Sequence, residues 1–192
     1  MENLRGFFAI LFLIVISSCA KEYSFEGGNP RPAVDTVRLP PPPPSYDFPV
    51  CSFCNSLPST PDLWTWSFKM ENMQACGKAD TAIVLNDRTV FTFFGPSSCS
   101  GDTGMVITVY LQNDTLNRDI RYLGTNKVSF FYYDRVTPSY IFMSQVYSSF
   151  SASIENYNHQ TRIATGKFEG FALRSDGHWV SINSGRFKVK LL

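Results

Sequence analysis

The chain has 192 residues, with 17 Lys and Arg against 16 Asp and Glu and a formal net charge of +1. Without a basic patch, this near-neutral balance argues against a nucleic-acid-binding protein, and we expect no nucleic-acid partner. Charged residues make up only 17% of the chain and aromatic residues 15%, a composition that suits strands better than helices.

The first 18 residues have the three parts of a secretory signal peptide. Arg5 supplies a positive start, residues 7–16 form an unbroken apolar run, and two serines stand before Cys19. The run is shorter than the about 20 residues that a transmembrane helix needs. We therefore predict a signal peptide over residues 1–18.

Small residues followed by Cys19 resemble the lipobox of bacterial lipoproteins, with Ile16 where that motif most often has Leu. The resemblance implies that the Cys19 thiol takes a diacylglycerol, that cleavage makes Cys19 the first residue, and that fatty acids such as palmitate complete the anchor. Each buried methylene of an acyl chain adds about 0.8 kcal/mol to membrane binding. An ordinary signal peptide with a chance cysteine is the alternative.

Residues 19–28, which read CAKEYSFEGG, resemble the mature start of many Bacteroidota lipoproteins. The resemblance implies an outer-membrane lipoprotein that faces the periplasm or the cell surface, held to the membrane by its N-terminal lipid. Glu22 and Glu26 fit only loosely the acidic residues that accompany surface export in that group. The likeness identifies a sorting class and implies no activity.

Residues 19–50 have no hydrophobic period and include five successive prolines, Pro40 to Pro44. Such a run favours polyproline II, because each proline has a fixed φ and lacks a backbone donor. We therefore expect a lipidated, disordered, Pro-rich tether over residues 19–50. One domain is expected over residues 51–192.

Four cysteines remain once Cys19 is lipidated: Cys51, Cys54, Cys76 and Cys99. An even number in an oxidising compartment predicts two disulfides. A zinc site is a weaker alternative, because Cys51-x-x-Cys54 is half of a zinc knuckle but the other two are far apart in sequence. A redox Cys-x-x-Cys is a further alternative.

The pairing is predicted from strand direction. If residues 64–70, 81–85 and 89–94 run up, down and up, Cys76 and Cys99 fall at the same end of the sheet. We therefore predict Cys76–Cys99 with Cys51–Cys54 as a local pair, although Cys51 and Cys54 could instead stay reduced. A bond from Cys51 or Cys54 to Cys76 or Cys99 is the competing pattern, expected if this meander is broken.

Alternation predicts the strands. Over residues 63–70, the apolar side chains fall on one face: Trp64, Trp66, Phe68 and Met70. Further strands are expected at 81–85, 89–94, 105–111 and 128–132, and less distinctly within 144–157. About eight strands joined by short turns predict an all-β domain, an antiparallel sandwich or a curled barrel.

The last two strands are predicted at residues 162–173 and 179–191, around the turn Ser175-Asp176-Gly177. In the final strand, one face is apolar and the other carries Arg186, Lys188 and Lys190. That row suits a solvated face or a protected edge strand better than a phosphate or headgroup site. The glycines and phenylalanines of the hairpin resemble the closing hairpin of uncharacterised β-rich lipoproteins: Gly166, Phe168, Gly170, Gly185 and Phe187.

We find no catalytic motif. His159 lies in a polar loop and His178 beside the predicted turn, and neither has a metal-ligand neighbour at usable spacing. We therefore expect no catalytic residue, no cofactor and no metal. Trp64, Trp66 and Trp179 could stack on sugars, although aromatics that alternate on a strand are more often core.

The sequence thus predicts a membrane-anchored cell-envelope lipoprotein with a non-catalytic binding or accessory domain for a ligand, a glycan or an envelope protein, and it does not identify which. The alternative is a small extracytoplasmic hydrolase with a site built from loops. An exposed aromatic platform would favour the first, and a cleft that joins two carboxylates, or His with Ser, would favour the second.

Overall fold

The structure is a computed structural model that describes residues 51–192, apart from 57, 59, 137, 138 and 147. These residues belong to one of the two units into which the chain divides, residues 42–192. The predicted signal peptide over 1–18, the lipidation at Cys19 and the tether over 19–50 lie outside the described residues and stay predictions.

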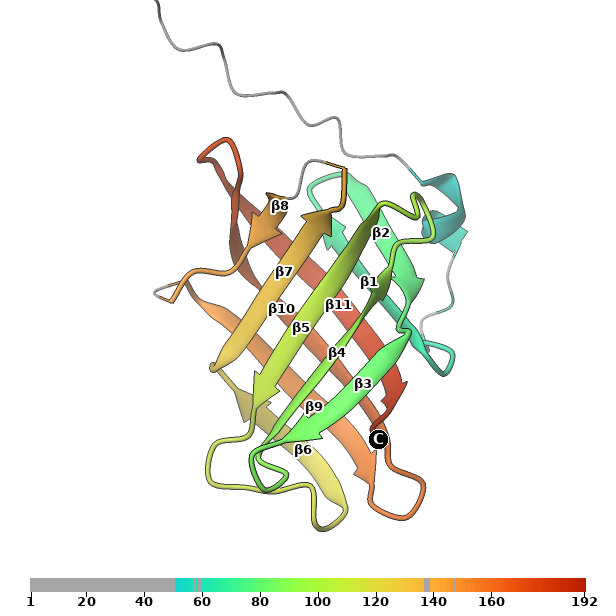
Figure 1. The fold of residues 1–192 in the computed structure, drawn as a ribbon, viewed down its shortest axis with the longest axis vertical. Helices are drawn as coiled ribbons and strands as arrows, with labels where there is room; N and C mark the ends of the chain where they lie inside the picture. Colours follow the sequence, from blue (N-terminus) through green and yellow to red (C-terminus); the bar gives the residue numbers. More distant parts are fainter. Residues whose placement is uncertain (1–50, 57, 59, 137–138, 147) are drawn as a thin grey trace, which may run out of the picture. The chain divides into compact units, whose positions relative to one another are not determined.

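The all-β class is confirmed, and the described residues form eleven strands rather than about eight. Figure 1 shows their arrangement. A 3-10 turn, η2 (Ser52–Ser56), precedes them. The strands are β1 (Thr65–Met70), β2 (Met73–Lys78), β3 (Thr81–Leu85), β4 (Val90–Pro96), β5 (Thr103–Tyr110), β6 (Ile120–Thr125), β7 (Val128–Asp134), β8 (Ser139–Met143), β9 (Phe150–Asn158), β10 (Ile163–Arg174) and β11 (Trp179–Lys190). No helix in the described part is long and apolar enough to cross a membrane.

All the strands join one antiparallel sheet, in the order β2-β1-β11-β10-β8-β7-β5-β4-β3. The sheet branches at β10, whose first part pairs with β9 and whose last two residues pair with β8. β6 extends the branch by pairing with β9. In Figure 1, β3, β4, β5 and β7 therefore cross in front of β9, β10 and β11.

The sheet curls until its two halves share one core. The rings of Phe93 in β4 and Phe187 in β11 lie 4.9 Å apart, although many strands separate β4 from β11 in the sheet order. Phe68 in β1 meets Phe130 in β7 edge-to-face at 5.5 Å. Such aromatic pairs add about 0.5–1.5 kcal/mol beyond the area they bury.

The two ends of the sheet meet without forming a continuous ladder. β2 makes a single bridge, from Gly77 to Ser97, with the chain just after β4, and the Ser98 N–H donates to the Cys76 carbonyl at 2.9 Å. We call this junction of β2 with residues 97–99 the seam. The sheet is therefore not closed into a barrel, because no ladder of paired strands crosses the seam among the described residues.

Reciprocal packing explains the Gly-x-Phe pattern of the closing hairpin. Gly166 pairs across the strands with Phe187, and Phe168 pairs with Gly185. A Cβ on either glycine would collide with the opposing phenylalanine ring. Each glycine therefore makes room for an aromatic ring that covers it.

Two sequence predictions need correction. The row Arg186, Lys188 and Lys190 does not lie on an edge strand, because β11 is paired on both sides, with β1 and β10. Lys190 is exposed and the other two are half-buried, so the solvated face remains the better interpretation. The other correction concerns the meander, which is broken by β2 between the first two predicted strands.

Candidate functional site

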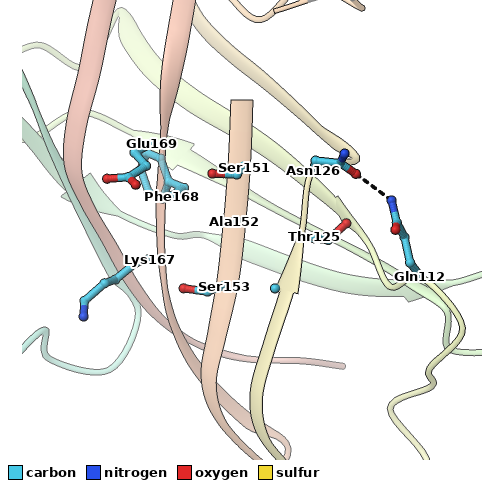
Figure 2. A pocket seen from close by; sticks show the side chains of 10 residues that line it. Gln112, Thr125, Asn126, Ser151, Ala152, Ser153, Lys167, Phe168 and Glu169 are labelled. Atoms are coloured by element: carbon cyan, nitrogen blue, oxygen red, sulfur yellow. Dashed lines mark hydrogen bonds between the residues drawn. The ribbon is translucent and has the colours of Figure 1, made fainter. Parts of the chain in front are cut away.

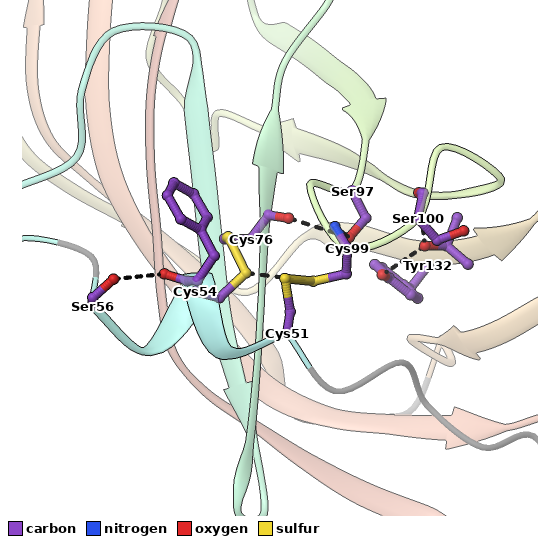
Figure 3. Close-up of a disulfide and its surroundings, with 10 residues drawn as sticks. Cys51, Cys54, Ser56, Cys76, Ser97, Cys99, Ser100 and Tyr132 are labelled. Atoms are coloured by element: carbon purple, nitrogen blue, oxygen red, sulfur yellow. Dashed lines mark hydrogen bonds between the residues drawn. A yellow bond between two sulfur atoms is a disulfide. The ribbon is translucent and has the colours of Figure 1, made fainter.

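The four cysteines meet at the seam, and the structure corrects their pairing. Cys51 bonds to Cys99 and Cys54 bonds to Cys76, with Cα–Cα distances of 5.3 and 5.5 Å (Figure 3). Two disulfides from these four residues are thus confirmed. The predicted pairs Cys76–Cys99 and Cys51–Cys54 are wrong, and the competing pattern, which ties Cys51 and Cys54 to the other two, is the one observed.

The pairing follows from β2. This strand returns along β1, so Cys76 lies within a strand rather than in the connection that the meander supposed. Cys76 and Cys99 still come close at the seam, as strand direction predicts, because Ser98 bonds to the Cys76 carbonyl. Cys51, just before η2, bonds to Cys99 on one side of the seam. Cys54, within η2, bonds to Cys76 on the other side.

An apolar platform lies on the outer face near the tip of the β10–β11 hairpin. Leu173 pairs across the strands with both Trp179 of β11 and Met143 of β8, which puts the three side chains in one row. Phe171 stands on the same face two residues before Leu173. Trp179 is 54% and Phe171 50% exposed. Together these four residues form what we call the hairpin platform.

Charged side chains border the hairpin platform at the turn. Asp176 accepts from Arg174 Nη2 at 3.1 Å and lies 3.2 Å from His178 Nδ1. The backbone N–H of His178 also donates to the Asp176 carboxylate, and this hydrogen bond, more than the neighbouring charges, lowers the pKa of Asp176. The exposed rings of the hairpin platform are thus bordered by oriented hydrogen-bond donors and acceptors at the turn.

A polar groove of about 500 Å³ lies across β6, β9 and β10 (Figure 2). Ser151 and Ser153 line its floor, and the Gln112 amide donates to Asn126 Oδ1 at 2.7 Å on one side. Lys167, on the other side, forms an ion pair with Glu155. Amides and hydroxyls dominate, which suits hydrogen bonding to a polar ligand and supplies no activated nucleophile.

Both histidines have partners that fit structural roles. His159 donates from its backbone to Asp119 at 2.7 Å, and its Nδ1 lies 3.0 Å from the Leu116 carbonyl oxygen. His178 is at the exposed turn already described. Among the contacts of the described residues, neither ring meets a serine hydroxyl. The geometry therefore gives no support to a Ser–His hydrolase.

The structure separates the three tryptophans. Trp66 is 1% exposed and belongs to the core, Trp64 is partly buried against it, and Trp179 is exposed. The sequence placed Trp179 at the start of the last strand but did not show that Leu173 and Met143 lie beside it. The Asp-Gly turn fixes the pairing of Leu173 with Trp179. The pairing of Leu173 with Met143 depends on β8 and is known only from the fold.

No family model matches the chain, and no curated protein or solved structure is significantly similar to it.

Proposed function

We propose that this protein is a lipid-anchored lipoprotein of the bacterial cell envelope whose β domain is a non-catalytic binding module, with the hairpin platform as its contact surface. The observation that supports the proposal is the exposure of Trp179 and Phe171 side by side with Leu173 on one sheet face. Large exposed apolar patches with a polar rim mark interaction sites, and Trp contributes strongly to such contacts.

The anchor is tested by changing Cys19 to Ser. The unchanged protein should partition into detergent with a mass increased by the lipid, and Cys19→Ser should release it into the aqueous phase. An unmodified Cys19 in membrane-extracted protein would end this part of the proposal.

The binding surface is tested by placing a benzophenone amino acid at Trp179 in cells that produce the chain. Benzophenone inserts into C–H bonds, so it captures a glycan or a protein, and digestion with protease or glycosidase tells them apart. Tyr122 of β6 is the matched control, because this aromatic residue is 81% exposed and lies outside the hairpin platform.

We expect one discrete crosslinked species from position 179, none from position 122, and loss of the species when Phe171→Ser is added. Equal crosslinking from both positions, or none from position 179, would count against the hairpin platform as the contact surface. Hydrolysis of a glycan or peptide by the purified protein would favour the alternative, an extracytoplasmic hydrolase.

A further inference from the structure

The cysteine cluster brings four sulfurs together from three separate segments. The segment of η2 and the residue before it supplies Cys54 and Cys51, β2 supplies Cys76, and the chain after β4 supplies Cys99. The sulfurs of Cys51, Cys54 and Cys99 lie within 4.8 Å of one another. Across the two disulfides, Cys54 Sγ is 3.5 Å from Cys99 Sγ.

These distances fit a tetrahedral metal site. A zinc ion with Zn–S bonds of about 2.3 Å places its four sulfurs about 3.8 Å apart. The separation between Cys54 and Cys99 is already close to that edge length. Cys76 is bonded to Cys54 but lies outside the group of three, so its sulfur must also approach the others when the bonded pairs open. The spacing Cys51-x-x-Cys54 is half of a zinc knuckle, and the seam supplies the second half that the sequence alone did not bring together.

The surroundings hold the ligands in place. The Cys54 N–H donates to the carbonyl of Cys51, just before η2, at 3.1 Å, which keeps these two residues in one turn. Ser97 Oγ accepts from the Cys99 N–H at 3.1 Å and donates to the Cys76 carbonyl at 3.3 Å. Cys54 and Cys76 are buried, whereas Cys51 and Cys99 are half-buried and give access from solvent.

We propose that the cluster of Cys51, Cys54, Cys76 and Cys99 binds one Zn²⁺ ion when it is reduced, so that either metal or disulfides close the seam. Two molecules of a dithiol reductant each give two electrons and two protons, open one disulfide and become disulfides themselves. Zinc then displaces the four thiol protons and takes four thiolates. A disulfide oxidant reverses the change, re-forms both bonds and releases the ion.

The test uses the full chain with Cys19→Ser in detergent, reduced without oxygen by a phosphine. Co²⁺ serves as the spectroscopic probe, because tetrahedral cobalt thiolates have distinct visible bands. We expect one Co²⁺ per chain, displacement by one Zn²⁺, and zinc binding on the order of nanomolar or tighter. The oxidised chain should bind neither ion at this site. If the reduced chain unfolds, zinc should restore its β-type circular dichroism spectrum.

Three variants separate a built site from loose thiol binding. Cys51→Ser with Cys54→Ser removes half of the ligands and should abolish the cobalt bands, whereas Ser151→Ala, which changes a hydroxyl of the polar groove in β9, should keep one ion per chain. Cys76→Ser should shift the bands to those of a three-thiolate ion. The proposal is overturned if the reduced chain gives no thiolate bands, or if the Cys51→Ser, Cys54→Ser variant binds zinc as tightly as the parent.

Discussion

Removing the disulfides one at a time tests the pairing and the energy of the seam. The bridge Cys51–Cys99 spans 48 residues and encloses Cys54–Cys76, which spans 22. Loop-closure entropy alone gives about 4.1 kcal/mol for the first and about 3.4 kcal/mol for the second when each is the only bridge. Because the loops are nested, the inner bridge shortens the outer loop to about 26 residues and lowers the outer contribution to about 3.5 kcal/mol.

The expected costs are therefore unequal and not additive. Cys51→Ser with Cys99→Ser should lower the free energy of unfolding by about 3.5 kcal/mol, and Cys54→Ala with Cys76→Ala by about 2.8 kcal/mol. Removing both bridges should cost about 7 kcal/mol, about 0.6 kcal/mol more than the two single losses together. Alanine is used at the buried pair so that no hydroxyl is left without a partner.

Urea unfolding followed by tryptophan fluorescence measures these values, since Trp66 is buried in the core. All variants carry Cys19→Ser, and a thiol assay confirms that the remaining bridge has formed. A loss below about 1 kcal/mol for both paired variants, against the 2–5 kcal/mol usual for native disulfides, would refute the nested-loop reasoning. A larger cost for the inner bridge than for the outer one would refute it as well.

Three further changes test the core and the boundary of the domain. Phe68→Ala should cost about 3–5 kcal/mol in unfolding experiments, because Phe68 is fully buried among aromatic rings. Burial raises the pKa of Tyr132 above the value near 10 of the unfolded chain, so the folded state favours the neutral phenol. The stability that this preference contributes is present below the unfolded pKa and is lost as pH rises towards the folded pKa. Tyr132→Phe should therefore flatten the alkaline decline in melting temperature. Deletion of residues 1–50 should leave the melting temperature unchanged, and a non-cooperative melt would contradict this.

The sequence was most informative where one sheet face is buried and the other is wet. β1 alternates between buried and half-buried or exposed residues, as do β5 from Met105 onward and most of β11, and all three were predicted near their observed bounds. The hairpin of β10 and β11 was also predicted, because the Asp-Gly turn fixes its register. A period of two in the side chains is a physical consequence of the pleat, so it can be read without the fold.

The missed strands lack that period for identifiable reasons. In β2, three successive residues, Ala75, Cys76 and Gly77, are buried, because the core covers one face and the disulfide-bonded turn η2 approaches the other. β6 pairs with β9 alone among the described strands, and most of its residues are exposed or half-buried. Its sequence therefore shows no alternation of apolar and polar residues. The cysteine pairing depends on β2, and the hairpin platform depends on β8, so both required tertiary information.

The position of the cysteine cluster connects the anchor to the fold. In the proposed lipoprotein, tension along the N-terminal chain reaches the described domain at Cys51, the first residue of the cluster. The bond to Cys99 passes the load to the β4 side of the seam, and the bond from Cys54 to Cys76 passes it to β2 on the other side. A single bond would pull one edge away from the other, where, among the described residues, one bridge and a few backbone hydrogen bonds join them. Two bonds would load both edges together, whereas the predicted pairing would join the edges through Cys76–Cys99 and leave Cys51 and Cys54 in a local ring without a bond to either edge.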